Sequence, residues 1–468
     1  MALLDENRLF SPDPILRRLS QALYDTVRDL PIISPHGHTD PQWYAENAAF
    51  PDPARLFVTP DHYVFRMLHS QGIPLEALGV PRVDGGETEE DPREIWRLFA
   101  SHYHLFRGTP SRLWIDHALQ EVFGVDQRLS SETADAVYDR IDDCLKQDAF
   151  RPRALFERFN IEAISTTESA IDELKWHRMI RDSGWSGKVV TAYRPDAVVD
   201  PEFQGFAANV EKMGEMAGED ATTWQGYLAA HRGRRAYFKE FGATSSDHGH
   251  STARTEDLPQ DVAAALFDKA LRGVCTEDEA DAFRGHMLTE MARMSLDDGL
   301  VLQIHPGSAR NHSNPIMARF GRDKGYDIPT RTDYVHALRP LLNAVGERSD
   351  LTIIVFTLDE TSYARELAPL AGVYPALKLG PPWWFHDSFE GMMRFREMAT
   401  ETAGFYNTVG FNDDTRAFCS IPARHDVARR VDCAFLANLV ATGRLAEDEA
   451  FEVAHDLAYR LAKQAYRL

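Results

Sequence analysis

Short apolar runs, rich in β-branched residues and separated by helical patterns, recur along this chain and constrain its fold more than any other feature. Runs of this kind are typical of buried strands. Eight of them can be recognised, at residues 30–38, 161–167, 189–194, 242–248, 300–305, 351–357, 374–380 and 406–414. Strands that alternate with helices indicate a parallel sheet, and eight of them indicate closure into a barrel. We therefore predict an α/β protein built on a (β/α)8 TIM-like barrel.

The interval between the first two runs is far longer than one crossover helix. Residues 92–102 and 133–146 show helical patterns within it, which predicts an inserted helical subdomain. The predicted divisions are residues 1–39 as the N-terminal segment and first barrel strand, 40–150 as the helical insertion, and 151–468 as the remainder of the barrel.

The composition excludes several classes of function. The 468 residues carry a net charge of −21, so a nucleic-acid backbone would be repelled. The N-terminal residues lack the pattern of a secretory signal, and no apolar stretch approaches the roughly 20 residues of a membrane span. The four cysteines are scattered, which is typical of a reduced compartment. We expect a cytoplasmic protein that binds neither nucleic acid nor membrane.

Two histidines separated by one residue close the first apolar run. Residues two apart in a strand point to the same face, so His36 and His38 would project together at the carboxyl end of the strand. Active sites of parallel α/β proteins are built at that end. One cation could take a nitrogen from each imidazole. Taken alone, the motif is explained equally well by two hydrogen-bonded loop histidines.

An aspartate follows the last apolar run. The first and last strands are neighbours in a closed barrel, so the carboxylate of Asp414 could face both histidines. Two histidines and one aspartate are an ordinary ligand set for a divalent ion, with positions left for water or substrate. An isolated aspartate is more often a helix cap or a solvated loop residue. Because Asp414 would lie opposite the two histidines, ligation of a metal ion is its favoured role.

Several arginines follow strand ends or lie near them. A single arginine of this kind is more often part of a surface salt bridge than a substrate ligand. Several together would form a positively charged pocket in a protein whose net charge is negative. A guanidinium binds a carboxylate through two hydrogen bonds, which favours a small anionic substrate. The aromatic residues Trp383 and Trp384 follow the seventh run and could belong to the core, to an interface or to a sugar-stacking wall.

The ordered set of motifs resembles the uronate isomerases, a family of the amidohydrolase superfamily. The resemblance runs nearly end to end. It rests on His36-Gly37-His38, Asp61-His62-Tyr63 with Arg66, Thr166-Thr167 with Asp172 and Leu174, Arg194-Pro195-Asp196, Ser246-Asp247-His248-Gly249, His305 with Arg310-Asn311, Trp383-Trp384-Phe385 before Asp387-Ser388, and Asp414-Thr415-Arg416 with Arg424-His425 before Arg429-Arg430. Two places depart from the family pattern. Asp413 precedes Asp414 where the family usually has Thr, and Val64-Phe65 stand where it has Lys-Trp.

The resemblance implies conversion of D-glucuronate to D-fructuronate, and of D-galacturonate to D-tagaturonate, by proton transfer through a cis-enediol. It also implies a distorted barrel with a helical insertion and a divalent metal, with zinc expected, on which the activity of the family does not uniformly depend. The roles that it implies are catalysis by Asp414, Tyr63 and Arg416, substrate binding by His62, Arg66, Arg194, His305, Arg310 and Trp383, and metal ligation by His36, His38 and Asp414. Asp414 cannot readily be both a tight ligand and a free base, and the sequence does not choose between these roles. We expect a homo-oligomer.

Two other functions are compatible with parts of this pattern. A metal-dependent hydrolase of the same superfamily would share His36, His38, His305 and Asp414 and would need its metal absolutely. The absence of an obvious lysine at the fourth strand and the presence of Asp61-His62-Tyr63 count against it. A non-catalytic sugar-acid binding protein would keep the arginines without needing both Asp414 and Tyr63.

Overall fold

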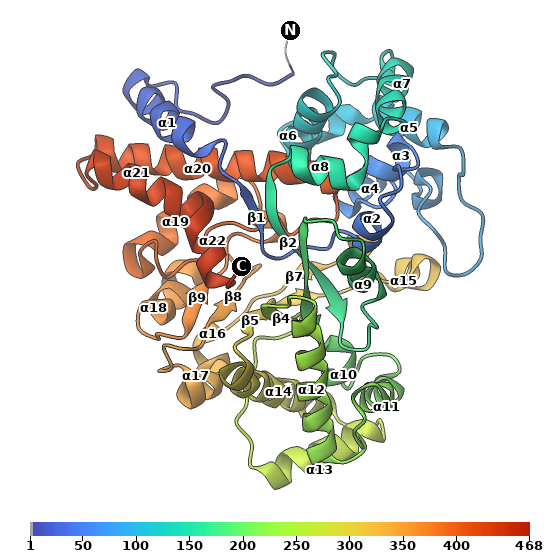
Figure 1. Ribbon diagram of the computed structural model, residues 1–468, viewed down its shortest axis with the longest axis vertical. Helices are drawn as coiled ribbons and strands as arrows, with labels where there is room; N and C mark the ends of the chain where they lie inside the picture. The colour runs from blue at the N-terminus through green and yellow to red at the C-terminus, as the bar shows by residue number, and fades with distance from the viewer. Residues whose placement is uncertain (1–2) are drawn as a thin grey trace.

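The computed structural model describes residues 3–468, and its centre is one curved parallel sheet (Figure 1). The strand order is β1-β2-β3-β4-β5-β8-β9, with every neighbouring pair parallel. The strands are β1 Ile32–Ser34, β2 Ile161–Ser169, β3 Lys188–Arg194, β4 Ser245–His248, β5 Val301–Ile304, β8 Ile353–Val355 and β9 Leu377–Leu379, with β6 Ser308–Ala309 and β7 Ile328–Pro329 forming a separate antiparallel pair. The predicted α/β class and barrel-like parallel sheet are confirmed.

The eighth predicted run completes the ring of strands only through isolated hydrogen bonds. Thr408 forms a single parallel bridge with Leu379, and within residues 3–468 no strand pairing joins β9 to β1. Gly410 has φ 74° and Asp414 has φ 38°, so this run cannot stay extended. The chain just beyond this run reaches the loop after β1, where the His38 amide donates to the Thr415 carbonyl at 3.1 Å. The barrel is therefore distorted on this side.

Helices surround the sheet. The α-helices are α1 Pro14–Val27, α2 Pro41–Glu46, α3 Pro53–Phe57, α4 His62–His69, α5 Pro92–Ser101, α6 Pro110–His117, α7 Ala134–Leu145, α8 Pro152–Arg158, α9 Lys175–Asp182, α10 Asp196–Val199, α11 Phe206–Ala217, α12 Trp224–Glu240, α13 Gln260–Leu271, α14 Glu277–Asp298, α15 Asn314–Phe320, α16 Tyr334–Ala337, α17 Arg339–Val345, α18 Ala368–Ala371, α19 Phe389–Ala403, α20 Ile421–Ala441, α21 Glu447–His455 and α22 Leu461–Ala465. Short 3₁₀ or π turns cover Leu75–Leu78, Tyr103–Phe106, Ala118–Val122, Asp148–Phe150, Tyr363–Leu367, Trp384–His386, Phe418–Ser420 and Asp456–Arg460.

Several helices of the N-terminal third begin at an Asp-Pro pair. Asp40, Asp52 and Asp91 each accept a hydrogen bond from a backbone N–H of the helix that follows them, and a proline occupies the first helical position. An aspartate cap satisfies a free N–H, and proline is already set at the helical φ and has no N–H to leave unpaired. These pairs explain why the segment between β1 and β2 is helical.

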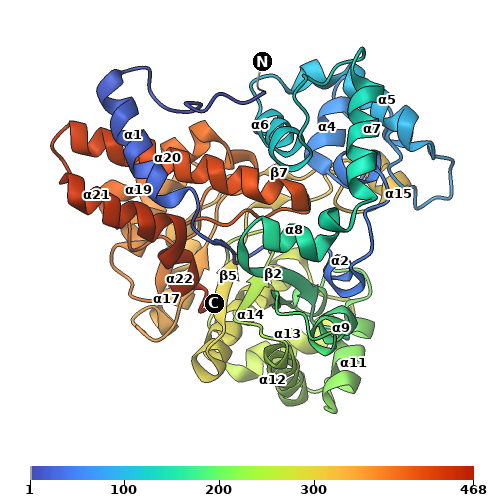
Figure 2. The same ribbon diagram turned by 45° about the horizontal axis from the view of Figure 1, so that its top comes forward.

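The helices between β1 and β2 form a group of their own beside the sheet, at the upper right of Figure 1. Their apolar side chains pack into one core that also includes Ile32 of β1 and Ile161 of β2. The predicted helices at residues 92–102 and 133–146 correspond to α5 and α7. On the other side, α1 lies along α20 and beside α21 in both ribbon views (Figures 1 and 2). The division at residues 39/40 and 150/151 stays a prediction.

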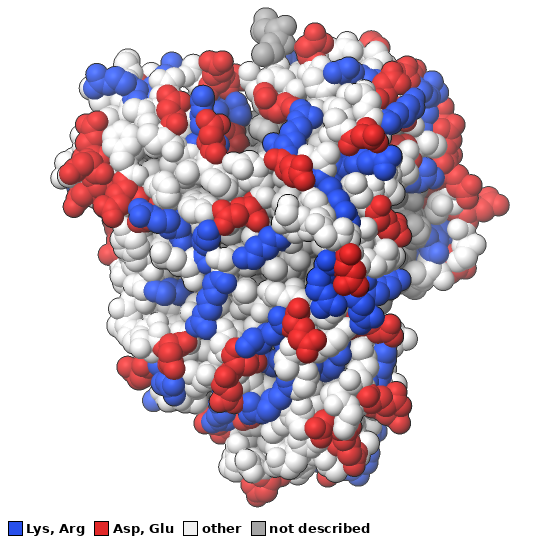
Figure 3. Space-filling model, viewed as in Figure 1, with Lys and Arg blue, Asp and Glu red and all other residues white. Residues whose placement is uncertain are grey.

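The surface carries both signs of charge. On the face drawn in Figure 3, acidic and basic side chains are interspersed. The net charge of −21 therefore does not place one sign over this whole face. None of the described helices has the length and apolar character needed to cross a membrane.

Candidate functional site

The two histidines of the first run lie in the loop after β1. Pro35 has no N–H with which to continue the ladder, so β1 ends at Ser34 and is shorter than the predicted strand of residues 30–38. The imidazoles of His36 and His38 therefore converge through the loop, and not through alternation along a strand. Their ring centroids lie 5.2 Å apart and the planes are nearly perpendicular.

The carboxylate of Asp414 lies against both imidazoles. His36 Nε2 is 3.5 Å and His38 Nε2 is 3.2 Å from Asp414 Oδ1. Burial by itself raises the pKa of Asp414, but the adjacent His36 and His38 outweigh it and hold this pKa below its usual value. Asp414 is therefore ionised at neutral pH. Its φ of 38° lies in the left-handed region, and strained backbone of this kind clusters at functional sites.

A second carboxylate supports the site from the neighbouring strands. His305 follows β5 and its Nδ1 hydrogen-bonds to Oδ1 of Asp247, on β4, at 2.6 Å. The His305 ring stacks on His36 with centroids 4.7 Å apart. Asp247 is fully buried and was not among the predicted site residues. Its position beside His248 at the end of a predicted strand was the signal that could have identified it.

Two groups of side chains that share His36 could hold a metal ion. One is His36, His38 and Asp414, and the other is His36, Asp247 and His305; the ligand atoms of each group lie within 4.8 Å of one another. Within the described residues, His305 Nε2 and Asp414 Oδ1 are buried and make no hydrogen bond of good geometry. Imidazole nitrogen and carboxylate oxygen suit first-row divalent ions. Burial lowers the pKa of His38, which favours the neutral, ligating form.

Arg194, at the end of β3, is held between two carboxylates. Its Nε donates to Asp196 Oδ2 at 2.8 Å, and its Nη1 lies 3.0 Å from Asp247 Oδ2. A Cβ on Gly249 would lie 2.2 Å from Arg194 Nη2. The absence of a side chain at Gly249 therefore lets the guanidinium stand directly over the loop after β4.

Two other arginines are only loosely paired. Arg310 lies 3.8 Å from Asp327, and Arg416 lies 3.8 Å from Asp323. Across residues 3–468, neither guanidinium makes a hydrogen bond to the protein within ordinary limits of distance and angle. Both therefore have donors available for an anionic ligand.

Helix α4 supplies an aromatic hydroxyl and an imidazole. Asp61 caps this helix by accepting the Tyr63 amide at 2.8 Å. Burial raises the pKa of Tyr63 well above its usual value, so its hydroxyl stays protonated. Burial and the nearby Arg416 lower the pKa of His62 to about 3, so this imidazole is neutral.

These groups line one cavity of about 640 Å³ at the carboxyl ends of the strands. The predicted residues on its wall are His36, His38, His62, Tyr63, Arg194, His305, Arg310, Trp383, Asp414 and Arg416. Arg66 is not on the wall, because its guanidinium lies between the rings of Tyr63 and Phe385, at 5.5 and 5.0 Å from their centroids. Trp383 meets His305 edge-on with centroids 4.9 Å apart.

A buried ion pair lies behind the wall and joins two residues of the family motifs, Asp387 and Arg424, whose contact was not predicted from the sequence. Arg424 pairs with Asp387, donates to the Asp413 carbonyl at 3.2 Å and stacks 3.6 Å over the ring of Trp114. Asp413, the charge added to the family pattern, accepts a hydrogen bond from His425 at 3.0 Å. Both contacts hold the backbone just before Asp414. The added aspartate therefore has an observed partner.

Comparison with known proteins places the whole chain among sugar-acid isomerases. The sequence model described as glucuronate isomerase matches residues 8–466. A protein named uronate isomerase from Rhizobium meliloti (strain 1021) is 68% identical over 466 residues, covering 100% of this chain and 99% of the relative. The crystal structure of glucuronate isomerase from Caulobacter crescentus superposes with a TM-score of 0.97 at 59% identity, covering 99% of this chain and 97% of that one. That of a uronate isomerase from Thermotoga maritima gives 0.91 at 28% identity, covering 99% of both chains.

Proposed function

This chain belongs to the uronate isomerase family, and from that premise we propose that it converts D-glucuronate to D-fructuronate and D-galacturonate to D-tagaturonate. The predicted isomerase activity agrees with relatives that match over the full length of the chain. The alternative of a hydrolase is not favoured by these matches.

The observation that carries the assignment of the site is the presence of two kinds of group in one cavity. Asp414 is an ionised carboxylate beside His36 and His38, whereas Arg310 and Arg416 have guanidinium donors without close protein acceptors. An open-chain hexuronate has a C1 aldehyde and C2 hydroxyl at one end and a C6 carboxylate at the other. We assign C6 to an arginine and the reacting carbons to the neighbourhood of Asp414.

The proton transfer follows from the protonation states. Asp414 accepts the C2 proton while the C2–H electron pair forms the C1–C2 double bond, and the protonated hydroxyl of Tyr63 donates to O1. The product of this step is the neutral cis-enediol. Asp414 then returns a proton to C1 while the phenolate of Tyr63 takes the proton from O2, which gives the ketose and restores both groups. Arg416 holds substrate oxygens during both steps, with His62, Arg194, His305 and Trp383 shaping the wall.

We assign His36, His38 and one carboxylate oxygen of Asp414 to a divalent cation, with zinc as the proposed ion. The other oxygen of Asp414 would then accept the C2 proton. When bound there, such an ion would stabilise negative charge that develops on a substrate oxygen. Asp247 fixes the orientation of His305 at the edge of this cluster. We also propose a homo-oligomer located in the cytoplasm, to be tested by light scattering and cell fractionation.

Proton NMR of the purified protein with D-glucuronate in deuterated water tests the proposal. Ketose that carries deuterium at C1 is the expected result, because the transferred proton exchanges with solvent on the base. Absence of any change in glucuronate and galacturonate, with and without added Zn²⁺, would overturn it. Repeating the reaction after chelation and dialysis measures how far activity depends on the cation.

A further inference from the structure

A third group of potential metal ligands lies beyond Arg194, outside the cluster around His36. Asp196 follows β3, while His248 ends β4 and His250 lies two residues later. One oxygen of Asp196 and one nitrogen of each imidazole lie within 4.8 Å of one another. None of these three side chains has a role in the proposed proton transfer.

Three of the four ring nitrogens of the two imidazoles lack a hydrogen-bond partner among residues 3–468, and the fourth, His248 Nε2, lies 3.3 Å from Ser246 Oγ. His250 is 4% exposed, and neither of its ring nitrogens has a hydrogen-bond partner among residues 3–468. His248 is 1% exposed, and its Nδ1 is likewise without a partner in that part of the chain. Buried polar atoms in native proteins are almost always satisfied by protein, water or an ion. Unpartnered buried nitrogens on two neighbouring imidazoles therefore point to an occupant of this site.

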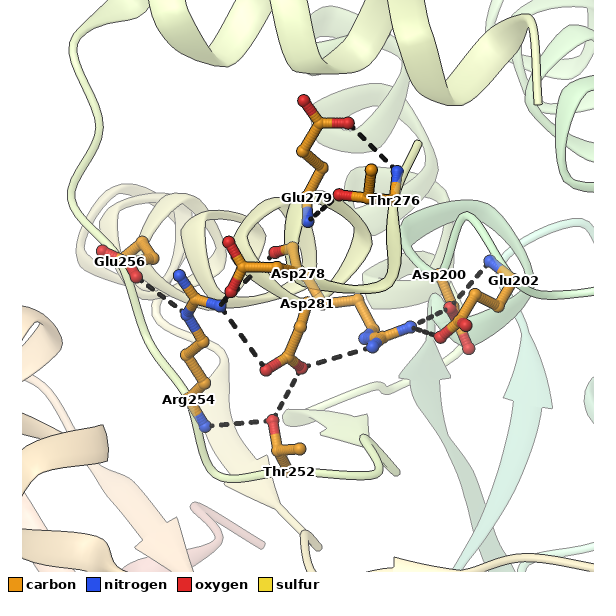
Figure 4. A network of polar contacts seen from close by, with 10 residues as sticks. Asp200, Glu202, Thr252, Arg254, Glu256, Thr276, Asp278, Glu279 and Asp281 are labelled. Atoms are coloured by element: carbon orange, nitrogen blue, oxygen red, sulfur yellow. Dashed lines mark hydrogen bonds and ion pairs between the residues drawn. The ribbon is translucent and has the colours of Figure 1, made fainter. Parts of the chain in front are cut away.

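The charge around this group favours a cation. Arg194 is shared by Asp196 and Asp247, so two negative charges face one positive charge. Near His250, Arg284 binds Asp200 and Glu202, each at 2.6 Å, and Asp281 at 3.2 Å. These three carboxylates belong to the polar network labelled in Figure 4, in which Arg254 also approaches Asp281.

The remaining charges near the two rings do not reverse this balance. The carboxylates around the two rings are Asp196, Asp200, Asp247 and Asp281, with Glu202 on Arg284. The guanidiniums are Arg235 and Arg284, together with Arg194 and Arg310, which approach Gly249 between the two histidines. Five carboxylates therefore face four guanidiniums.

We propose that Asp196, His248 and His250 form a second divalent-cation site, distinct from the cluster of His36, His38 and Asp414. Two imidazole nitrogens and one carboxylate oxygen are a ligand set for Zn²⁺, Co²⁺ or Ni²⁺. Asp196 lies on the wall of the large cavity, so an ion and its remaining water ligands reach the site from that side.

Metal stoichiometry tests this site independently of isomerase activity. The apo protein is dialysed against Zn²⁺, and bound metal per chain is counted by elemental analysis for the wild type, His250→Asn and His336→Asn. His336 is an exposed histidine that is also paired with an aspartate, Asp333 at 2.7 Å, and it controls for surface binding. The expected result is one equivalent fewer in His250→Asn than in the other two proteins. Equal stoichiometry in all three would overturn the proposal, with water as the occupant.

A second measurement keeps the test valid if His250→Asn does not fold. The double variant His36→Asn/His38→Asn removes the first cluster and leaves Asp196, His248 and His250 in place. Titration with Co²⁺ should still fill one equivalent and give visible absorption bands of nitrogen-ligated cobalt. No bound cobalt in a folded double variant would overturn the proposal.

Discussion

His305 and Asp247 are joined by a 2.6 Å hydrogen bond between Nδ1 and Oδ1 at the ends of two adjacent strands, β5 and β4. The bond fixes which ring nitrogen of His305 carries the proton, and so directs the other nitrogen, Nε2, away from Asp247. Nε2 is buried without a protein partner in the described part of the chain. It is therefore the atom of His305 that is free to contact substrate or a cation.

Replacing Asp247 with Asn should lower kcat about 10–100-fold, because supporting partners of site histidines have effects of that order. The variant loses the charge that orients His305 and pairs with Arg194. Steady-state kinetics with D-glucuronate measure the change. Asp297→Asn is the matched control, since Asp297 is an exposed carboxylate paired with Arg232, and it should behave as wild type. Equal kcat in both variants would contradict a positioning role for Asp247.

Replacing Asp414 with Asn should abolish exchange of the C2 proton, with a loss of about 10²–10⁴-fold in kcat, because the amide cannot act as a base. NMR in deuterated water measures both exchange and turnover. Asp413→Asn is the neighbouring control. Asp413 faces His425, so this variant should lower kcat less than Asp414→Asn does. Retained exchange in Asp414→Asn would assign the base to another residue.

The strand count and the convergence of polar residues could be predicted from sequence because both depend on local patterns. Apolar runs located all seven strands of the sheet, and parallel strands bring their carboxyl ends to one edge. The failure of residues 406–414 to form a full strand could not be read from apolar character alone. It follows from the left-handed backbone at Gly410 and Asp414, which depends on tertiary contacts.

The supporting residues were harder to predict than those on the wall. Asp387 and Arg424 are 37 positions apart, and only the fold places them in contact. Arg66 is assigned to substrate binding from the family resemblance, and the motif that carries it does not show where its side chain points. The helical turn of α4 instead turns its guanidinium toward Phe385. Its assigned role in substrate binding stays a prediction.

Replacing Arg310 with Met should raise KM for D-glucuronate about 10–100-fold, since hydrogen bonds to charged groups contribute about 1.5–3 kcal/mol. Because Arg310 lies 3.8 Å from its nearest carboxylate, its loss leaves no tightly bonded acid unpaired. Arg331→Met is the control, since Arg331 is exposed and does not line the cavity. An unchanged KM in Arg310→Met would place the substrate carboxylate on another arginine.

The stability of the protein should fall as pH rises through the range in which Glu168 titrates. Burial raises the pKa of Glu168 from about 4.5 to about 8 despite hydrogen bonds from Thr166 and Thr191. The folded state then binds a proton that the unfolded state has released, so the free energy of unfolding declines between those two pKa values. Glu168→Gln cannot ionise and should remove this part of the decline, which amounts to a few kcal/mol at most.

Urea denaturation at about pH 5.5 and about pH 8.5 measures that decline. The expected difference between the two conditions is larger in the wild type than in Glu168→Gln. Glu277→Gln, at an exposed position on α14, is the control and should retain the wild-type difference. An identical pH dependence of the free energy of unfolding in all three proteins would show that ionisation of Glu168 does not destabilise the folded state.

Replacing Gly249 with Ala should weaken substrate binding through Arg194. The new Cβ would lie 2.2 Å from Arg194 Nη2, so the guanidinium must move away from the loop and from its contacts with Asp196 and Asp247. We expect KM to rise about 10-fold, the effect of losing one charge-assisted hydrogen bond. Gly233→Ala, where a Cβ makes ordinary contact at 3.4 Å on α12, is the control. The decisive comparison measures Gly249→Ala in the wild type and in Arg194→Met. If the alanine acts by displacing Arg194, it has no further effect on KM once that guanidinium is gone. An equal effect on KM in both backgrounds would mean that Gly249 acts through the loop itself.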